Sequence, residues 1–537
     1  MGNVQGMISD RNRSVIWNAE AVGEGLKAIT LCRQDLLGHV KDLLDGYHGE
    51  TRSRAYYDLL VGNWLELFAH QTYVAWREAL QGNIPADRHQ ITVAADPASY
   101  QHRSLFEGGK PAQLLWEIAC LLEGASPDDW DFECEEVLIE SVGNKRSFSR
   151  LLKWISPSRP DVLVTMPYFK CPKLEWLGAL WRWRRWLKWD DLDCHAIRVN
   201  AIVDTEWRRT QAAAETQTLS LSGLLRALLP LHLPVVFLEG FAGYRRAVMD
   251  LPVARPKVVY SANALYNNMI FKFLVAEWRQ KGTKLLYHQH GGGYGIDRIH
   301  AYEDFEIRVS DRYYTWGWRR EESHVEPLGT PLPYAPRRIR KWLLLCCNEY
   351  PRVVYRLQYY PLPGRVNVLY QQTCEFLAAL PDRNNVLVRP YPHDYGWGGP
   401  EMMQEAAPEA AFDDCQVSPF VRFAESRLVV FNHLGTGWLE TLALNIPTVC
   451  FFDPDAYAFR ESAQPYVDAL EQVGILHRSG IEAASFVAWL GGSPERWWNE
   501  PNVQEIRKNF VDNFANFSCD WKNQWENEFE AVLDGSR

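Results

Sequence analysis

The sequence has no long hydrophobic run. Its most apolar window, 224–241, contains Arg226, Glu239 and two prolines, whereas a membrane-spanning helix needs about 20 predominantly apolar residues. The first 14 residues also lack the apolar segment of an export signal. We therefore expect a cytoplasmic protein, with attachment to the inner face of the inner membrane as the alternative.

The chain also has little positive charge. Its 57 Lys and Arg are outnumbered by 67 Asp and Glu, which gives a net charge of −10. Proteins that bind nucleic acid in general present a basic surface. The charge balance therefore speaks against a nucleic-acid partner.

The cysteines show no metal-binding or disulfide pattern. There are 11, and none forms a CxxC pair. An odd number without an export signal indicates reduced thiols. His288 and His290 would share one face of a strand, but no third ligand follows at a recognisable spacing. We expect no bound metal.

What is present indicates a multidomain protein. The 537 residues are 47% hydrophobic, and a single core rarely exceeds roughly 250–300 residues. Residues 1–88 are predicted to be a helical extension, because apolar residues recur every three or four positions along 36–44 and 56–68. Ser53 is the expected cap of the second helix.

Residues 89–332 alternate short β-branched runs with helical stretches, which predicts a parallel sheet covered on both faces. Its expected strands begin at Ile91, Val137, Val162, Val235, Val258 and Lys284. A proline-rich break at 327–336 precedes a second such unit over 333–500, with expected strands from Trp342, Val386, Leu428 and Thr448. Residues 501–537 are predicted to form a C-terminal helix. The sequence thus predicts an α/β protein with two Rossmann-like parallel-sheet domains facing a cleft, where loops after the strands bind ligands.

The most distinctive segment is His288-Gln-His-Gly-Gly-Gly-Tyr-Gly295, which follows a predicted strand. Four glycines in five residues let backbone amides approach phosphate or carboxylate oxygens closely. The segment is neither a dinucleotide fingerprint, since Ile296 stands where glycine is needed, nor a P-loop. We interpret it as a functional loop rather than a flexible turn. Its candidate residues are His288, His290, Gly291, Gly292, Gly293, Tyr294 and Gly295.

Acidic residues follow this loop closely. Glu306 and Asp311 are candidates for the same site, because a carboxylate beside a histidine can orient its tautomer or act as a base itself. A solvated loop and an edge strand are the alternative for both. For Glu303 the solvated loop is favoured.

The second α/β unit offers Arg389, directly after a predicted strand and before Tyr391 and His393. The planar guanidinium could pair with a phosphate. The alternative is a proline-rich turn in which Arg389 forms a structural ion pair.

A further turn runs from Asn432 through Gly435 and Thr436 into a predicted helix that contains Glu440. Thr436 could cap the helix and leave its other first-turn amides free for an anion. Glu440 would lie one turn on, on the same face. An ordinary βαβ unit is the alternative.

The segment 176–189 contains five tryptophans and four cationic residues. Such a segment can lie in a membrane interface against anionic head groups, and we expect this contact. The alternative is a helix whose tryptophans pack into the core. Stacking on nucleic-acid bases would fit the same residues but not the acidic chain.

These segments together resemble a bacterial family of transferases from surface-polysaccharide and O-antigen loci, which is similar to the Kdo transferases and the CDP-glycerol glycerophosphotransferases of GT-B fold. The resemblance covers most of the chain and includes 53–65, 288–295, 310–318, 389–392 and 434–440. In the glycerophosphotransferase pattern the catalytic histidine falls on His290. The second histidine falls on Tyr391, two residues before His393, and the phosphate-binding turn falls on Asn432, Gly435 and Thr436 with one hydroxyl lost. These departures speak against a CDP-polyol donor.

The resemblance implies a GT-B glycosyltransferase that uses a nucleotide-activated sugar, with a CMP-linked acidic sugar as the favoured donor and a surface glycan or glycolipid as acceptor. The domain over 89–332 would bind the acceptor, and the domain over 333–500 would bind the donor. His290 is expected to be the general base, with Glu306 or Asp311 orienting or replacing it. Arg389, Thr436 and the helix start would hold the donor phosphate, and no cofactor is expected. The alternatives are a CDP-polyol phosphotransferase, a nucleotide-sugar epimerase and a non-catalytic membrane-docking partner.

Overall fold

The protein is described by a computed structural model that covers residues 17–83, 90–101, 110–133, 136–141, 157–192, 195–333 and 338–535. Residues 1–14, which lack the apolar segment of an export signal, and residues 334–336 of the proline-rich break lie outside these ranges.

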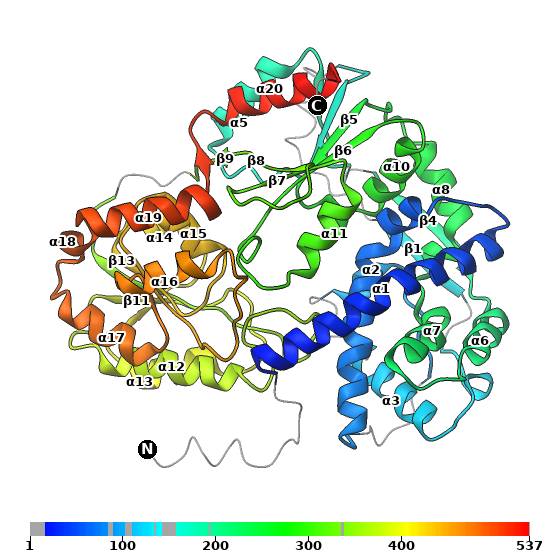
Figure 1. The fold of residues 1–537 in the computed structure, drawn as a ribbon, viewed down its shortest axis with the longest axis horizontal. Helices are drawn as coiled ribbons and strands as arrows, with labels where there is room; N and C mark the ends of the chain where they lie inside the picture. Colours follow the sequence, from blue (N-terminus) through cyan, green and yellow to red (C-terminus); the bar gives the residue numbers. More distant parts are fainter. Residues whose placement is uncertain are drawn as a thin grey trace.

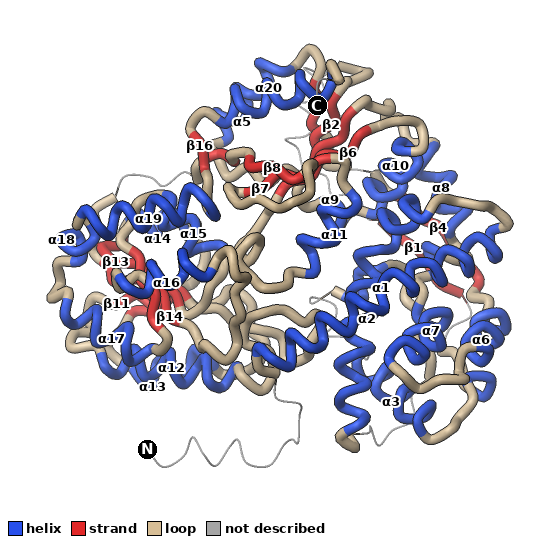
Figure 2. Tube along the Cα trace, viewed as in Figure 1, coloured by secondary structure: helices blue, strands red, loops and turns tan. Residues whose placement is uncertain are grey.

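Two six-stranded sheets, parallel throughout, form the body of the protein (Figure 2), and they confirm the predicted GT-B-like α/β architecture. The first sheet has the order β3-β2-β5-β6-β7-β8 and the second the order β12-β11-β10-β13-β14-β15. The strands of the first are β2 (Val162–Thr165), β3 (Leu187–Trp189), β5 (Val258–Ser261), β6 (Lys284–His288), β7 (Arg312–Thr315) and β8 (Val325–Pro327). Those of the second are β10 (Trp342–Cys346), β11 (Val386–Arg389), β12 (Ala411–Phe412), β13 (Ser426–Phe431), β14 (Thr448–Phe451) and β15 (Leu476–His477).

Three of the predicted strands do not belong to these sheets. Ile91 forms a single bridge with Phe132, and Val235–Phe237 is a buried 3₁₀ helix. Val137 lies in β1 (Glu136–Ser141), which pairs antiparallel with β4 (Ile197–Ile202) in a separate ladder. For Val235 the cause is that a short apolar run is equally compatible with any buried segment. Val137 does lie in a strand, but that strand is largely unburied and pairs only with β4 among the described residues.

Helices cover the sheets and fill the N-terminal part of the chain (Figure 1). In the first half they are α1 (Ala19–His48), α2 (Arg54–Leu80), α3 (Lys110–Leu122), α5 (Lys173–Trp183), α6 (Thr205–Ala214), α7 (Leu221–His232), α8 (Phe241–Met249), α9 (Ala264–Asn267), α10 (Met269–Arg279) and α11 (Ala301–Val309). In the second they are α12 (Val366–Ala379), α13 (Gly399–Ala406), α14 (Pro419–Ala424), α15 (Thr436–Ala443), α16 (Gln464–Gln472), α17 (Gly480–Trp489), α18 (Pro494–Trp498), α19 (Pro501–Phe514) and α20 (Trp521–Leu533).

The N-terminal hairpin α1–α2 joins the two halves of the molecule. Ser53 caps α2 as predicted, its hydroxyl accepting from the amide of Tyr56. The amide of Ala19, at the start of α1, donates to the carbonyl of Asp455 in the second half at 2.6 Å. In Figure 1, α1 runs from the second domain to the first.

The C-terminal segment forms two helices instead of the single one predicted. After α19, the short strand β16 (Phe517–Ser518) pairs with β9 (Thr330–Pro331). Helix α20 then lies against the first sheet, where Trp525 is 4.5 Å from the ring of Tyr260. The chain thus ends in the first domain.

Most tryptophans of segment 176–189 pack into the core between the first sheet and α20. The ring centroids of Trp176 and Trp183 lie 6.0 and 5.9 Å from that of Trp521 in α20. Trp186 and Trp189 are half-buried, and only Trp181 is exposed, at 56%. Core packing therefore accounts for four of the five. In the described part of the chain, no helix combines the length and the apolar character that a membrane crossing requires.

Candidate active site

A cavity of about 250 Å³ lies between the two sheet domains. The first domain contributes Gly292, Gly293, Asp297 and His300, all after β6. The second contributes the start of α15 and seven tyrosines from its loops: Tyr350, Tyr355, Tyr359, Tyr360, Tyr391, Tyr395 and Tyr457. The cavity lies where an α/β protein is expected to bind ligands, beyond the carboxyl ends of its parallel strands.

The glycine loop after β6 is held by the second domain. The amide of Gly292 donates to Thr436 Oγ1 at 3.0 Å. Further along, Asp297 pairs with Phe459 in an isolated antiparallel bridge, and the amide of Arg460 donates to the carbonyl of Ile296 at 2.9 Å. The loop is therefore part of the domain interface as well as of the cavity wall.

Replacing Gly292 by alanine should disturb this interface. A Cβ there would lie 2.9 Å from the carbonyl carbon and oxygen of Gly435. We expect G292A to lower the free energy of unfolding by about 1–3 kcal/mol, the usual cost of overpacking, in urea denaturation. The control is G291A, whose Cβ would be 3.6 Å from its nearest neighbour. Equal stability of the two variants would contradict the close contact.

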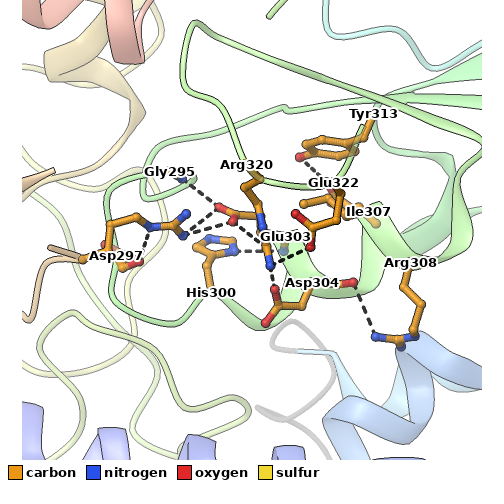
Figure 3. Close-up of polar contacts among 12 residues, drawn as sticks. Gly295, Asp297, His300, Glu303, Asp304, Ile307, Arg308, Tyr313, Arg320 and Glu322 are labelled. Carbon is orange, nitrogen blue, oxygen red and sulfur yellow. Dashed lines mark hydrogen bonds and ion pairs between the residues drawn. The ribbon is translucent and has the colours of Figure 1, made fainter. Parts of the chain in front are cut away.

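Glu303 fixes the far end of the loop (Figure 3). Its buried carboxylate accepts from the amide of Gly295 at 2.7 Å and from Nη2 of Arg460 at 3.0 Å. Arg320 approaches the same carboxylate at 3.1 Å. The expected solvated loop is therefore wrong for Glu303, which lies buried in α11 because ion pairs compensate its carboxylate. One of these ion pairs crosses between the domains.

His290 and Glu306 come together as predicted. Nδ1 of His290 lies 3.4 Å from Glu306 Oε1, and 18% of the histidine side chain is exposed. Nδ1 also lies 3.3 Å from the hydroxyl of Tyr294. Burial, and to a lesser extent the charge of Arg356, lowers the pKa of His290 to about 3. The imidazole is therefore neutral near pH 7, and Nε2 is the nitrogen left for a substrate.

Glu306 is fully buried among hydroxyls. It accepts hydrogen bonds from Tyr266, from Tyr294 at 2.8 Å and from Tyr313 at 2.9 Å. Burial raises the pKa of Glu306 to about 8, although these hydroxyls act in the opposite direction. The carboxyl group thus titrates close to neutral pH, as acid–base residues of active sites often do.

Asp311 and His288 are not brought to this site. Asp311 accepts from the amide of Leu285 at 2.6 Å and pairs with Arg279 at 2.9 Å, so it ties β6 to a helix. His288 is fully buried at the end of β6, and its ring lies 5.4 Å from that of Trp525. The contacts of Asp311 and His288 therefore indicate structural roles for both residues.

Of the predicted donor residues, Tyr391, Gly435 and Thr436 line the cavity. Arg389 instead pairs with Asp413 and donates to the carbonyl of Val417 at 3.0 Å. Its alternative, the structural ion pair, is therefore the one observed.

Three other donor candidates also lie off the cavity. His393 is exposed and packs edge-on against Tyr395. Asn432 is buried, and its Oδ1 accepts from the amide of Asn348 at 3.1 Å, which links two loops. Glu440 is buried and pairs across the domain interface with Lys170 at 2.5 Å.

The sequence reasoning missed Arg356, His300 and Gln289. Arg356 and His300 line the cavity, whereas Gln289 supports the loop, accepting from the indole of Trp318 at 2.7 Å. The sequence did contain a signal for the segment that includes Arg356, because four tyrosines occur within 350–360, shortly after β10.

No group of three or more His, Cys, Asp or Glu side chains is arranged to hold a metal ion within the described ranges.

Comparison with known proteins gives one family match. A family model described as "LIC12162 family transferase" matches residues 17–529. No curated protein matches the chain.

Several solved structures are distantly similar. S. aureus MnaA with UDP has 10% identity and a TM-score of 0.34, over 52% of this chain and 77% of that one. The wall teichoic acid polymerase TagF has 9% identity and a TM-score of 0.34, over 73% and 93%. A Thermobaculum terrenum O-GlcNAc transferase variant has 12% identity and a TM-score of 0.34, over 95% and 99%.

Proposed function

Because the chain belongs to the LIC12162 family of transferases, we propose that it is a glycosyltransferase that moves a sugar from a nucleotide-activated donor to a hydroxyl of a bacterial surface glycan or glycolipid. The observation that supports this best is the pair of His290 and Glu306, next to a loop that lines the interdomain cavity.

His290 is the proposed general base. With its Nδ1 proton directed at Glu306, Nε2 takes the proton of the acceptor hydroxyl while that oxygen forms a bond to the anomeric carbon of the sugar. The bond between the anomeric carbon and the phosphate oxygen breaks, and its electron pair leaves with the phosphate. Glu306 orients the imidazole and stabilises the imidazolium, since a carboxylate favours the charged form of a neighbouring histidine.

In this proposal the donor nucleotide binds in the interdomain cavity. Tyr350 and Tyr360 are stacked at 4.5 Å with an interplanar angle of 12°, and Tyr391 and Tyr395 are nearly parallel at 6.0 Å. Aromatic faces suit a nucleobase because every base has a π-face. The first amides of α15 border the same space and suit a phosphate.

A thermal-shift screen with CMP, CDP, UDP, GDP and dTDP tests the donor. A ligand that binds only the folded state stabilises it, by about 2.7 kcal/mol at 100 times its Kd. A shift with CMP would support an acidic sugar donor, with CDP a polyol-phosphate donor, and with UDP an epimerase or a UDP-sugar transferase. An epimerase would turn over its substrate without an acceptor. No shift with any nucleotide at millimolar concentration would favour the non-catalytic docking partner.

Membrane contact remains part of the proposal, on a smaller surface. Leu174 and Trp181 lie on the same face of α5, two turns apart, and their side chains are exposed at 83% and 56%. We expect replacement of both by serine to reduce sedimentation with anionic liposomes. The control is W489S, which removes a tryptophan exposed at 68% on α17. Equal sedimentation of all three proteins would remove membrane contact from the proposal.

A further inference from the structure

Arg356 is a cationic side chain in the cavity without an anionic partner. Its Nη2 donates to the amide oxygen of Gln358. Its Nε and Nη1 are buried and have no hydrogen-bond partner among the described residues. The guanidinium carbon lies 3.6 Å from the ring centroid of Tyr302. It also lies 5.6 Å from the ring centroid of Tyr355.

Nearby arginines are arranged differently. Arg460 pairs with Glu303 at 3.0 Å, and Arg365 pairs with Asp453 at 2.6 Å. Leaving buried donors of a charged group unpaired is costly. A guanidinium kept in this state at the wall of a cavity therefore fits a ligand that supplies the missing acceptors.

Two other groups on the cavity wall favour an anion. Nδ1 of His300 accepts from the amide of Glu303 at 3.1 Å, so the proton of the neutral ring resides on Nε2 and that nitrogen is a donor. The N-terminal end of α15 contributes the positive end of a helix dipole.

Among the described residues, neither carboxyl group on the same wall, Asp297 or Glu349, forms an ion pair with Arg356. Burial raises the pKa of Asp297 well above its usual range and raises that of Glu349 as well. Glu349 also accepts from the amide of Tyr395 at 3.2 Å.

We infer that Arg356 binds a phosphoryl group of the ligand in this cavity, and that helix α2 holds the arginine in position. The inference deepens the proposed function, because the phosphoryl group would be that of the activated donor. Phosphate fits better than a carboxylate, since the helix end and the stacked tyrosines border the same space.

The positioning comes from α2, which holds the backbone on both sides of Arg356. Nδ1 of His70 accepts from the amide of Leu357 at 3.0 Å. The side-chain amide of Gln71 donates to the carbonyl of Tyr355 at 3.3 Å. Burial lowers the pKa of His70 to about 3, so it remains an acceptor at neutral pH. In α1, a Cβ on Gly25 would lie 2.5 Å from the Leu357 side chain, so α1 also packs closely against this segment.

Calorimetry with the full-length protein tests the phosphoryl site, using pyrophosphate, UDP and CMP as probes and uridine and cytidine as uncharged controls. R356Q should weaken binding of the nucleotide that binds, and of pyrophosphate, about 10- to 100-fold, the usual range for a charged hydrogen bond. Nucleoside binding should not change. R352Q is the matched control, because Arg352 belongs to the same segment but is exposed and outside the cavity.

Unchanged phosphate affinity in R356Q would overturn the inference, as would an equal loss for the nucleosides. Pyrophosphate binding without nucleotide binding would support the anion site and place its source in another phosphate ester. Phosphate binding through Arg356 without sugar transfer would leave the inference standing and defeat the proposed function. Sugar transfer by R356Q with an unchanged donor KM would defeat the inference and leave the proposed function standing.

His70 is tested as a positioning residue by H70L and H70Q. H70L removes the acceptor for the Leu357 amide and should raise the donor KM more than it lowers kcat, whereas glutamine keeps an acceptor and should restore the KM. Gln71→Leu is the second variant in case H70L does not fold. A KM unaffected in both H70L and Q71L would overturn the role of α2.

Discussion

Replacing His290 by alanine is expected to lower kcat about 10²- to 10⁴-fold, the usual contribution of a general base, with the Kd of the donor nucleotide unchanged. The separation follows from the geometry. Nδ1 of His290 lies 3.4 Å from Glu306 in the first domain, whereas the stacked tyrosines and α15 belong to the second domain.

The control is His324→Ala, which removes a half-buried imidazole from the same domain. Nε2 of its ring lies 3.1 Å from the carbonyl oxygen of Ile307. This variant should keep the rate of the unaltered protein. A His290→Ala enzyme with undiminished kcat would refute the assignment of the base, and a large loss of nucleotide affinity would indicate that His290 shapes the donor site instead.

The sheets could be predicted because buried parallel strands leave a strong local signal. Val162, Val258 and Thr448 begin runs that are apolar on both faces, and all three are strands. Val235 begins a run of the same kind, yet it lies in a 3₁₀ helix. Its surroundings are set by distant segments, for example by Ala94, whose carbonyl accepts from its amide.

The candidate site was predictable where the functional residues are local to a motif. His290, Gly292 and Thr436 come from recognisable segments, and the structure brings their loops together. Arg389 illustrates the limit, because its partner Asp413 lies 24 residues away and on a neighbouring strand end. No local pattern distinguishes an arginine with such a partner from one without.

The contact between α2 and the segment that contains Arg356 was also not predictable from a local sequence pattern. His70 and Leu357 are 287 residues apart in sequence, so no periodicity could connect them. The helical N-terminal segment looks like an addition to the two-domain frame, yet its contacts reach the wall of the interdomain cavity. A polar residue in a buried helix therefore marks a long-range contact that only the folded chain identifies.

Glu306→Gln is expected to remove the ascending limb of the pH–rate profile. Glu306 must be ionised for His290 to direct its Nδ1 proton at it and present Nε2 as a base. Because burial raises the pKa of Glu306 to about 8, kcat/KM should rise with pH toward an apparent pKa near 8 that belongs to the coupled pair. Glutamine keeps an oxygen for the tyrosine hydroxyls but cannot ionise. The variant should therefore be slower and show no such rise.

The stability of the protein provides an independent measurement of the same ionisation. A carboxyl group whose pKa is raised in the folded state stabilises the fold fully below its unfolded pKa of about 4.5 and loses this contribution as pH rises toward 8. The unfolding free energy should therefore fall relative to that of E306Q over this window, by at most about 1.4 kcal/mol per pH unit for one proton. His290 contributes in the opposite sense, but only below its unfolded pKa of about 6.5, so the difference between the two proteins from pH 6.5 to 8 isolates Glu306. Parallel stability curves together with an unaltered pH–rate profile would show that Glu306 is ionised throughout and only orients the ring.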